Sequence, residues 1–338
     1  MSTHSELHHG GRLRVAAARY GIALADWLDL STGINPNGWP VPALPASLWT
    51  RLPEDDDGLE AAAQDYYGTA HVLPVAGSQA AIQALPQLIP PCHAGVIHPG
   101  YAEHASAWRR AGHTVELVPI AEIDAATFRS NVIVLMHPNN PTGTRFRHER
   151  LLRWRQALAA RGGWLVVDEA FIDATPEQSL APLSNQPGLI VLRSLGKFFG
   201  LAGARVGFVC AEPKLLARLK AQLGPWTVPT PSRHLAAQAL DDHAWQASAR
   251  QQLRLAGARL AELLTRHDLA PQGGCSLFQW VATPHAADLH DALARSGILT
   301  RLFETPASVR FGLPGTEIDW ARLDAALTRI RSRAGVRS

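Results

Sequence analysis

The middle of the chain alternates short apolar segments with helical patterns, and this alternation most constrains the fold. Seven segments are apolar and rich in β-branched residues, which is typical of strands buried on both faces: 72–75, 95–98, 114–119, 132–136, 164–167, 189–192 and 206–210. Helical patterns cover 79–89, 102–111 and 148–160 between them. The alternation predicts an α/β fold with a mostly parallel, doubly wound sheet.

The pattern changes after residue 213. Helical spacing covers 215–223 and 245–266, strand patterns cover 276–281 and 308–311, and a closing amphipathic helix carries Trp320, Leu323, Leu327 and Ile330. This region predicts a smaller α+β domain, which the N-terminal helix at 13–20 would join. We therefore expect a large domain of residues 37–225 and a small domain made of 1–36 and 226–338.

Composition excludes several classes of protein. Hydrophobic residues make up 46% and charged residues 18%, which is typical of a globular chain and not of a disordered or fibrous one. No apolar stretch approaches the roughly 18 residues of a membrane span, and residues 1–10 lack the apolar core of a signal peptide. The basic residues are scattered, which argues against nucleic-acid binding. Three cysteines without a CxxC motif fit reduced thiols and a cytoplasmic protein, and no metal site is expected.

The segment 193–207 carries the strongest chemical signal. Lys197, one of only three lysines, follows a predicted strand, and ligands bind at the carboxyl ends of strands in open α/β sheets. Ser194 and Arg205 flank it with a hydroxyl and a guanidinium, both good phosphate ligands. A phosphate-bearing cofactor that condenses with an amine would use such a set. The alternative is an exposed loop lysine beside glycines that serve only packing.

Four other predicted strands are also followed by groups that can bind a ligand: Gly77-Ser78-Gln79, Tyr101, Asn140 and Asp168. A helix start can hold an anion, and a carboxylate at a strand end can pair with a protonated ring nitrogen. Taken singly, each group also fits a turn, a helix cap or simple packing. Because this fold brings strand ends to one crevice, five such groups together predict one site.

In order and spacing, these groups resemble the fold-type I pyridoxal-phosphate enzymes of the aminotransferase superfamily. The series Gly-Ser-Gln, Tyr, Asn-Pro-Thr-Gly, Asp-x-x-Phe and Ser-x-x-Lys-x7-Arg matches that family across about 130 residues. The resemblance implies that Lys197 carries pyridoxal 5′-phosphate and moves protons, and that Asp168 keeps the pyridine nitrogen protonated. It also implies that Asn140 bonds the ring hydroxyl and Tyr101 stacks on the ring. The cofactor phosphate would be surrounded by Gly77, Ser78, Gln79, Ser194 and Arg205.

A second set of residues is implied to bind substrate. The segment 308–312 looks like the family segment whose arginine, here Arg310, forks onto the substrate α-carboxylate. Within the superfamily the chain looks most like the threonine-phosphate decarboxylases of cobalamin biosynthesis, with histidinol-phosphate aminotransferases as close cousins. His-Gly-Gly at 9–11 and Asn-Pro at 35–36 favour the decarboxylases. By resemblance, His9, Asn35 and Arg301 would lie at the substrate end, with Arg301 facing the substrate phosphate.

The resemblance thus implies decarboxylation of a small phosphorylated amino acid, L-threonine O-3-phosphate, by a homodimer. The alternatives are a histidinol-phosphate aminotransferase and a non-catalytic aminotransferase-like regulatory or binding protein. Two positions depart from the family. Leu52 stands where many relatives have a tyrosine that reaches the cofactor phosphate of the neighbouring subunit. Phe171 stands where many aminotransferases have a tyrosine, which agrees with the decarboxylase pattern.

Overall fold

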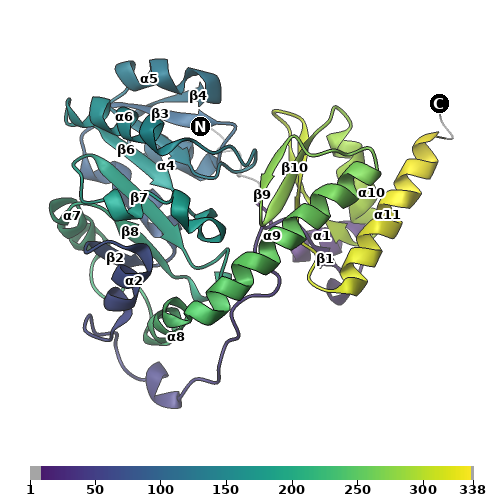
Figure 1. The fold of residues 1–338 in the computed structure, drawn as a ribbon, viewed down its shortest axis with the longest axis horizontal. Coiled ribbons are helices and arrows are strands. Elements are labelled where there is room, and N and C mark those ends of the chain that lie inside the picture. The colour runs from purple at the N-terminus through teal and green to yellow at the C-terminus, as the bar shows by residue number, and fades with distance from the viewer. Residues whose placement is uncertain (1–8, 336–338) are drawn as a thin grey trace. The chain divides into compact units, whose positions relative to one another are not determined.

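A computed structural model describes residues 9–335, with side chains described through residue 332. The chain divides into two compact units (Figure 1). The larger contains Gly38–Asn140 and Thr144–Arg250, and the smaller contains the described residues up to Asn37, Pro141–Gly143 and the chain from Gln251 onward. Residues 226–250, which we expected in the small domain, lie with the larger unit because helix α8 (Thr230–Asp241) packs against α2 (Leu59–Tyr67).

The larger unit contains a seven-stranded sheet in the order β2-β8-β7-β6-β5-β3-β4. All neighbouring strands are parallel except β8, which runs antiparallel to β2 and β7. The seven predicted strands are all present, which confirms the predicted α/β sheet. Their bounds are β2 (Val72–Val75), β3 (His93–His98), β4 (Thr114–Pro119), β5 (Val132–Met136), β6 (Trp164–Asp168), β7 (Leu189–Ser194) and β8 (Gly207–Cys210).

Helices cover the face of the sheet toward which alternate strand residues, such as Val134 and Val166, point. There α3 (Ser78–Ala84), α4 (Ala102–Arg110) and α7 (Pro213–Leu223) form one apolar core with the strands. The strand residues between them, such as Leu135 and Val167, are also fully buried, as expected of a sheet covered on both faces. The remaining helices of this unit include α5 (Ile123–Arg129) and α6 (His148–Ala159).

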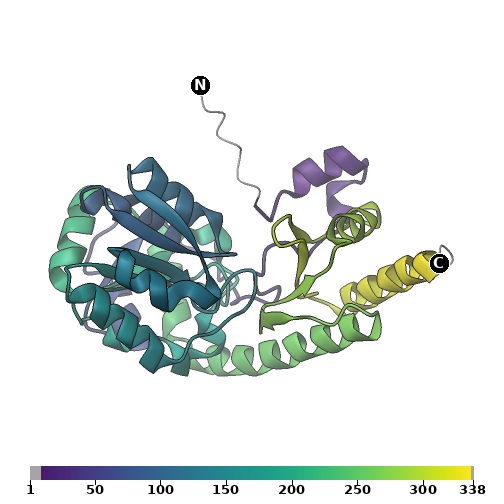
Figure 2. The same cartoon turned by 90° about the horizontal axis from the view of Figure 1, so that it is seen from above.

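The smaller unit contains an antiparallel sheet in the order β12-β13-β10-β9 and a short parallel pair, β1 with β11. Helix α1 packs against α10, and the two lie side by side in Figure 2. Ala16 and Ala294 belong to their shared apolar cluster. The boundary between the units falls inside the long helix α9. The bounds are α1 (Leu13–Tyr20), β1 (Leu28–Asp29), α9 (His243–Arg266), β9 (Gly273–Cys275), β10 (Phe278–Ala282), α10 (Ala286–Arg295), β11 (Ile298–Leu299), β12 (Arg301–Phe303), β13 (Ser308–Gly312) and α11 (Glu317–Gly335).

In the described part of the chain, none of the helices has the length and apolar character that crossing a bilayer requires. The same residues contain no group of three or more His, Cys, Asp or Glu side chains placed to hold a metal ion.

Candidate active site

The first residue of β8 brings two predicted phosphate-binding segments together. Gly207 pairs with Val75 at the end of β2 and with Ser194 at the end of β7. A Cβ added to Gly207 would come within 2.5 Å of the backbone nitrogen of Ser78, which begins α3. Ser78 and Ser194 therefore lie at the same edge of the sheet, beside the positive end of a helix dipole that favours an anion.

Gly77 and Arg205 complete this edge. Gly77 has a φ of +71°, a backbone conformation that favours glycine, and a Cβ there would lie 2.5 Å from Nη2 of the Arg205 side chain. Arg205 itself has a φ of +55°, which is unusual for a residue with a side chain and is typical of functional positions. The structure thus brings together four of the five predicted phosphate contacts: Gly77, Ser78, Ser194 and Arg205.

Asp168 ends β6 as a buried carboxylate, with 2% of its surface exposed. Its Oδ2 accepts a hydrogen bond from His104 Nε2 at 2.9 Å, and its Oδ1 accepts one from the backbone nitrogen of Ala170 at 3.0 Å. These two bonds fix the orientation of the carboxylate. His104 is a functional candidate that the sequence reasoning missed, although it lies in the first turn of the helix predicted at 102–111, three residues after Tyr101.

Lys197 lies in the connection between β7 and β8 and is half-buried. Its Nζ is 5.5 Å from the ring centroid of Phe171, a buried side chain three residues after Asp168. The backbone nitrogen of Leu195 donates to the carbonyl of Val206 at 3.1 Å, which closes the loop that carries the lysine. The lysine thus follows β7 and the carboxylate ends β6, and these two strands are parallel neighbours.

Tyr101 and the turn containing Asn140 lie close to one another. Asn139 Nδ2 donates to the carbonyl of Pro99 at 2.9 Å, which joins the turn after β5 to the turn after β3. The hydroxyl of Tyr101 lies 3.2 Å from Oε1 of Gln79, so the side chain of this predicted phosphate contact faces the tyrosine. Whether Gln79 also contacts a phosphate stays a prediction.

A buried ion cluster lies directly beside these residues in the chain, and the sequence reasoning missed it. Arg193 donates to Glu169 Oε2 at 2.8 Å and also pairs with Asp173, and all three side chains are at most 2% exposed. Burial alone lowers the pKa of Arg193, but the charges of Asp173 and Glu169 outweigh it and raise that pKa above its usual range. The cluster joins the end of β7 to the residues after β6.

In the smaller unit, Arg310 and Arg301 are paired residues of the adjacent strands β13 and β12. Arg310 is 4% exposed, and its Nη2 donates to the carbonyl of Ser31 at 2.7 Å. Burial, followed by the charge of Arg301, lowers the pKa of Arg310 to about 10, and the opposing contributions of Cys275 and Asp29 are smaller. Two guanidinium groups in register form a strongly anion-attracting position.

Ser31 contacts the segment that follows His9, another predicted substrate residue. Its hydroxyl accepts a hydrogen bond from the backbone nitrogen of Gly11 at 2.8 Å, and a Cβ on Gly10 would come within 2.3 Å of its carbonyl oxygen. The exposed His9, the first described residue, is therefore held next to the segment that Arg310 contacts.

Asn35 is buried, and its Oδ1 accepts a hydrogen bond from the backbone nitrogen of Asn37 at 3.0 Å.

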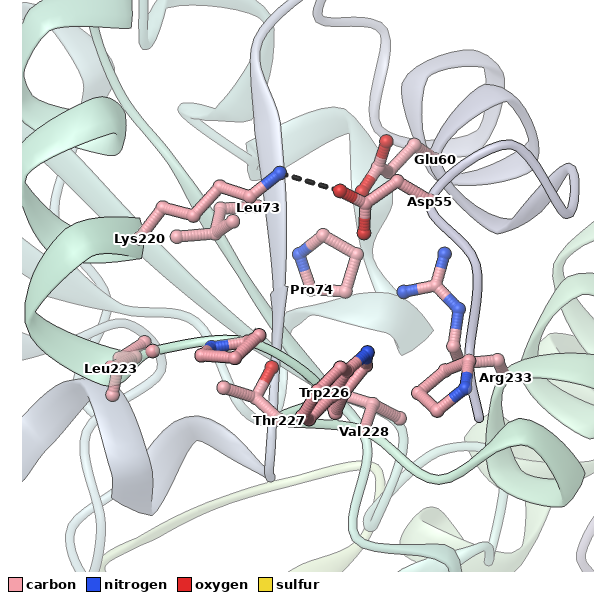
Figure 3. A pocket seen from close by; sticks show the side chains of 13 residues that line it. Asp55, Glu60, Leu73, Pro74, Lys220, Leu223, Trp226, Thr227, Val228 and Arg233 are labelled. Carbon is pink, nitrogen blue, oxygen red and sulfur yellow. Dashed lines mark hydrogen bonds and ion pairs between the residues drawn. The ribbon is translucent and has the colours of Figure 1, made fainter. Parts of the chain in front are cut away.

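The larger unit also has a cavity of about 190 Å³, partly open to solvent, and none of the predicted site residues lines it (Figure 3). Lys220 and Asp55 form an ion pair of 2.6 Å across it, and Trp226 lines another side. Trp226 is 61% exposed and has a φ of +59°. Both basic side chains of the cavity already have carboxylate partners, Lys220 with Asp55 and Arg233 with Asp57, so it is a poor candidate for the catalytic site.

The predicted site residues thus form two sets. The nine predicted cofactor residues all belong to the larger unit, and the four predicted substrate residues all belong to the smaller unit.

Comparison with known proteins identifies the family. The model of the family "Aminotransferase class I and II" matches residues 52–330. A threonine-phosphate decarboxylase from Pseudomonas aeruginosa is 58% identical over 97% of this chain and 99% of its own length. One from a Sinorhizobium species is 42% identical over 95% and 98%. The crystal structure of histidinol-phosphate aminotransferase from Sinorhizobium meliloti in complex with pyridoxal-5′-phosphate is similar with a TM-score of 0.86, at 20% identity over 99% of both chains.

The solved structure confirms the predicted fold, and the two relatives confirm the resemblance drawn from the sequence motifs. Because the family model and both relatives cover most of its length, the chain belongs to the aminotransferase class I and II family and, within it, to the threonine-phosphate decarboxylases.

Proposed function

We propose that this chain decarboxylates L-threonine O-3-phosphate to (R)-1-aminopropan-2-yl phosphate with pyridoxal 5′-phosphate, as a step of cobalamin biosynthesis. The names of the 58% and 42% identical relatives support this activity over histidinol-phosphate transamination. The structural observation that carries the proposal is the register of Arg301 with Arg310. The substrate bears a carboxylate and a phosphate monoester, and these are the two anions that planar guanidinium groups bind best.

The residues of the larger unit fit the cofactor. Gly77 lets the guanidinium of Arg205 approach the backbone closely, and the start of α3 offers backbone N–H groups to a phosphate. Asp168 would pair with the protonated pyridine nitrogen, and Lys197 would hold the cofactor through Nζ. When bound, pyridoxal phosphate supplies a ring that takes up the electron pair of the bond broken at the substrate Cα.

The protein's own part in the reaction is to orient the substrate and to move protons. Arg310 would grip the substrate carboxylate and Arg301 the phosphate, and this grip would select the bond from Cα to the carboxylate for cleavage. Cleavage of that bond would release CO2, and Lys197 Nζ would deliver a proton to Cα. The hydrogen bonds from His104 and Ala170 keep the Asp168 carboxylate aligned throughout.

The test is to incubate the enzyme with each candidate substrate, with and without 2-oxoglutarate. We expect CO2 from L-threonine O-3-phosphate with no requirement for the oxo acid. Glutamate formed from histidinol phosphate, without CO2 from threonine phosphate, would overturn the proposal in favour of the aminotransferase. Activity with neither substrate would favour a non-catalytic role.

Borohydride reduction tests the role of Lys197. The reagent should fix the cofactor on the peptide that contains Lys197, and Lys197→Ala should abolish both labelling and the visible absorbance. Lys220→Ala is the matched control, because this exposed lysine is paired with Asp55 and should leave both unchanged. Label on Lys214 or Lys220 would contradict the assignment.

We further propose a homodimer located in the cytoplasm. Support for self-association comes from exposed apolar side chains near the cavity in Figure 3: Leu52 is 62% exposed, and its neighbour Pro53 lines the cavity together with the exposed Trp226. The three cysteines form no disulfide, as in proteins of reducing compartments. Trp226→Asp should weaken the dimer in sedimentation, and a monomeric, active wild-type protein would refute it.

A further inference from the structure

The hydroxyl of Tyr101 is the end of a hydrogen-bond chain that leads to a carboxylate. It lies 3.2 Å from Gln79 Oε1, and Gln79 Nε2 lies 2.9 Å from Glu103 Oε2. Gln79 is the second residue of α3, whereas Tyr101 and Glu103 lie at the start of α4. All three side chains are half-buried. The chain therefore joins two helix starts that flank the predicted cofactor residues.

The hydrogen bonds of this series can have only one donor-to-acceptor direction, from Tyr101 through Gln79 to Glu103. An ionised carboxylate only accepts hydrogen bonds, so Gln79 must present its NH2 group to Glu103. The amide oxygen of Gln79 then faces Tyr101 and can only accept, so the phenol must donate. The charge of Glu103 thus fixes both the orientation of the Gln79 amide and the position of the Tyr101 proton.

Glu103 is itself held in place. Gln83 Nε2 donates to the same oxygen, Oε2, at 3.2 Å, and Gln83 Oε1 accepts from Arg110. Glu103 also lies in the first turn of α4, where the helix dipole stabilises a negative charge. The anchor of the chain is therefore fixed by contacts that are independent of Tyr101.

We propose that Gln79 and Glu103 are positioning residues that hold the Tyr101 ring as a stacking surface for the cofactor. Because its proton is committed to Gln79, the Tyr101 hydroxyl serves as an anchor and not as an acid or base. The inference rests on the proposed use of pyridoxal phosphate but not on the substrate, so its test uses no substrate and remains decisive if decarboxylation is not observed.

A double-mutant cycle on cofactor binding tests the proposal. Gln79→Met and Tyr101→Phe should each weaken pyridoxal-phosphate binding to the apoenzyme by about two- to tenfold, the range expected for one hydrogen bond. Each should also reduce the circular dichroism of the bound cofactor, which reports the asymmetry of its surroundings. In the double variant, the effects should equal those of one substitution, because both remove the same bond.

Two further variants sharpen the cycle. Glu103→Gln should produce part of the Gln79→Met effect, since a neutral amide no longer dictates the orientation of Gln79. Gln64→Met is the matched control: it removes an exposed glutamine donor to the carbonyl of Ala70 in the same unit and should leave cofactor binding and dichroism unchanged. Thermal unfolding of each apoenzyme separates a loss of folding from a loss of positioning.

Effects of Gln79→Met that persist in full in the Tyr101→Phe background would overturn the proposal, because Gln79 would then act on the cofactor without the tyrosine. Unchanged dichroism in Gln79→Met and Glu103→Gln, with both proteins folded, would overturn it as well.

Discussion

Each unit contains a buried arginine beside a predicted functional residue, and the two have opposite environments. Arg193 in the larger unit and Arg310 in the smaller are 2% and 4% exposed. Arg193 lies between the carboxylates of Glu169 and Asp173, which raise its pKa. The largest charge effect on Arg310 comes from a second arginine, Arg301, and together with burial it lowers the pKa to about 10.

From this contrast we expect Arg193 to be a structural charge and Arg310 to bind a ligand. Burying an ion costs free energy unless a counter-ion compensates. For Arg193 the fold supplies the counter-ions, so the arginine stabilises the turn that leads from β7 to Lys197. For Arg310, burial and the charge of Arg301 outweigh the favourable charges of Cys275 and Asp29, which suits an arginine that is to bind an anion. We therefore expect the same residue type to serve two different purposes in the two units.

Removing Arg193 should give the largest effect on stability. Arg193→Met leaves Glu169 and Asp173 buried without their cation, which should lower the free energy of unfolding by about 3–5 kcal/mol. Chemical denaturation measures the change. Arg150→Met is the matched control, because its pair with Asp124 is partly exposed and should contribute less than about 1 kcal/mol. A loss of less than about 1 kcal/mol in the free energy of unfolding of Arg193→Met would contradict a structural role for this arginine.

Removing Arg310 should impair activity and spare the fold. Arg310→Met should lower kcat/KM by more than tenfold, since losing one partner of a desolvated ion pair costs about 2–5 kcal/mol. The free energy of unfolding should fall by less than in Arg193→Met, because burial and the charge of Arg301 already oppose the charge of Arg310. The control Arg259→Met in the same unit removes an exposed pair with Glu317 and should leave kinetics unchanged. Unaltered kcat/KM in Arg310→Met would place the carboxylate site elsewhere.

The smallest effect is expected for His137, a buried histidine whose contribution to stability depends on pH. Burial lowers the pKa of this histidine to about 4, below the ordinary value of 6.5. The unfolded chain therefore binds the proton first, and stability falls as pH drops from about 6.5 toward 4. The loss at pH 5 should be about 2 kcal/mol. His137→Gln should flatten this part of the pH–stability curve, and an unchanged slope would contradict the assignment.

Local pattern was enough to predict the larger unit's sheet. Continuous apolar segments such as 132–136 are typical of strands buried on both faces, and the turns after them carry the predicted ligand-binding groups. The short helices α2, α5 and α10 (the last being Ala286–Arg295) were missed, as was the strand β12. Their sequences are brief, and packing against neighbours stabilises them more than their own periodicity does.

What the sequence determined by itself was the identity and order of the reactive groups: Lys197, Asp168 and the glycine and serine turns are fixed by local spacing. Only the tertiary structure decided which charges are compensated. The bond from His104 to Asp168 spans 64 residues, and the ion pair from Arg193 to Glu169 spans 24. The pairing of Arg301 with Arg310 depends on the register of β12 with β13. Such contacts depend on how distant segments pack, and burial then sets the strength and sign of each electrostatic interaction.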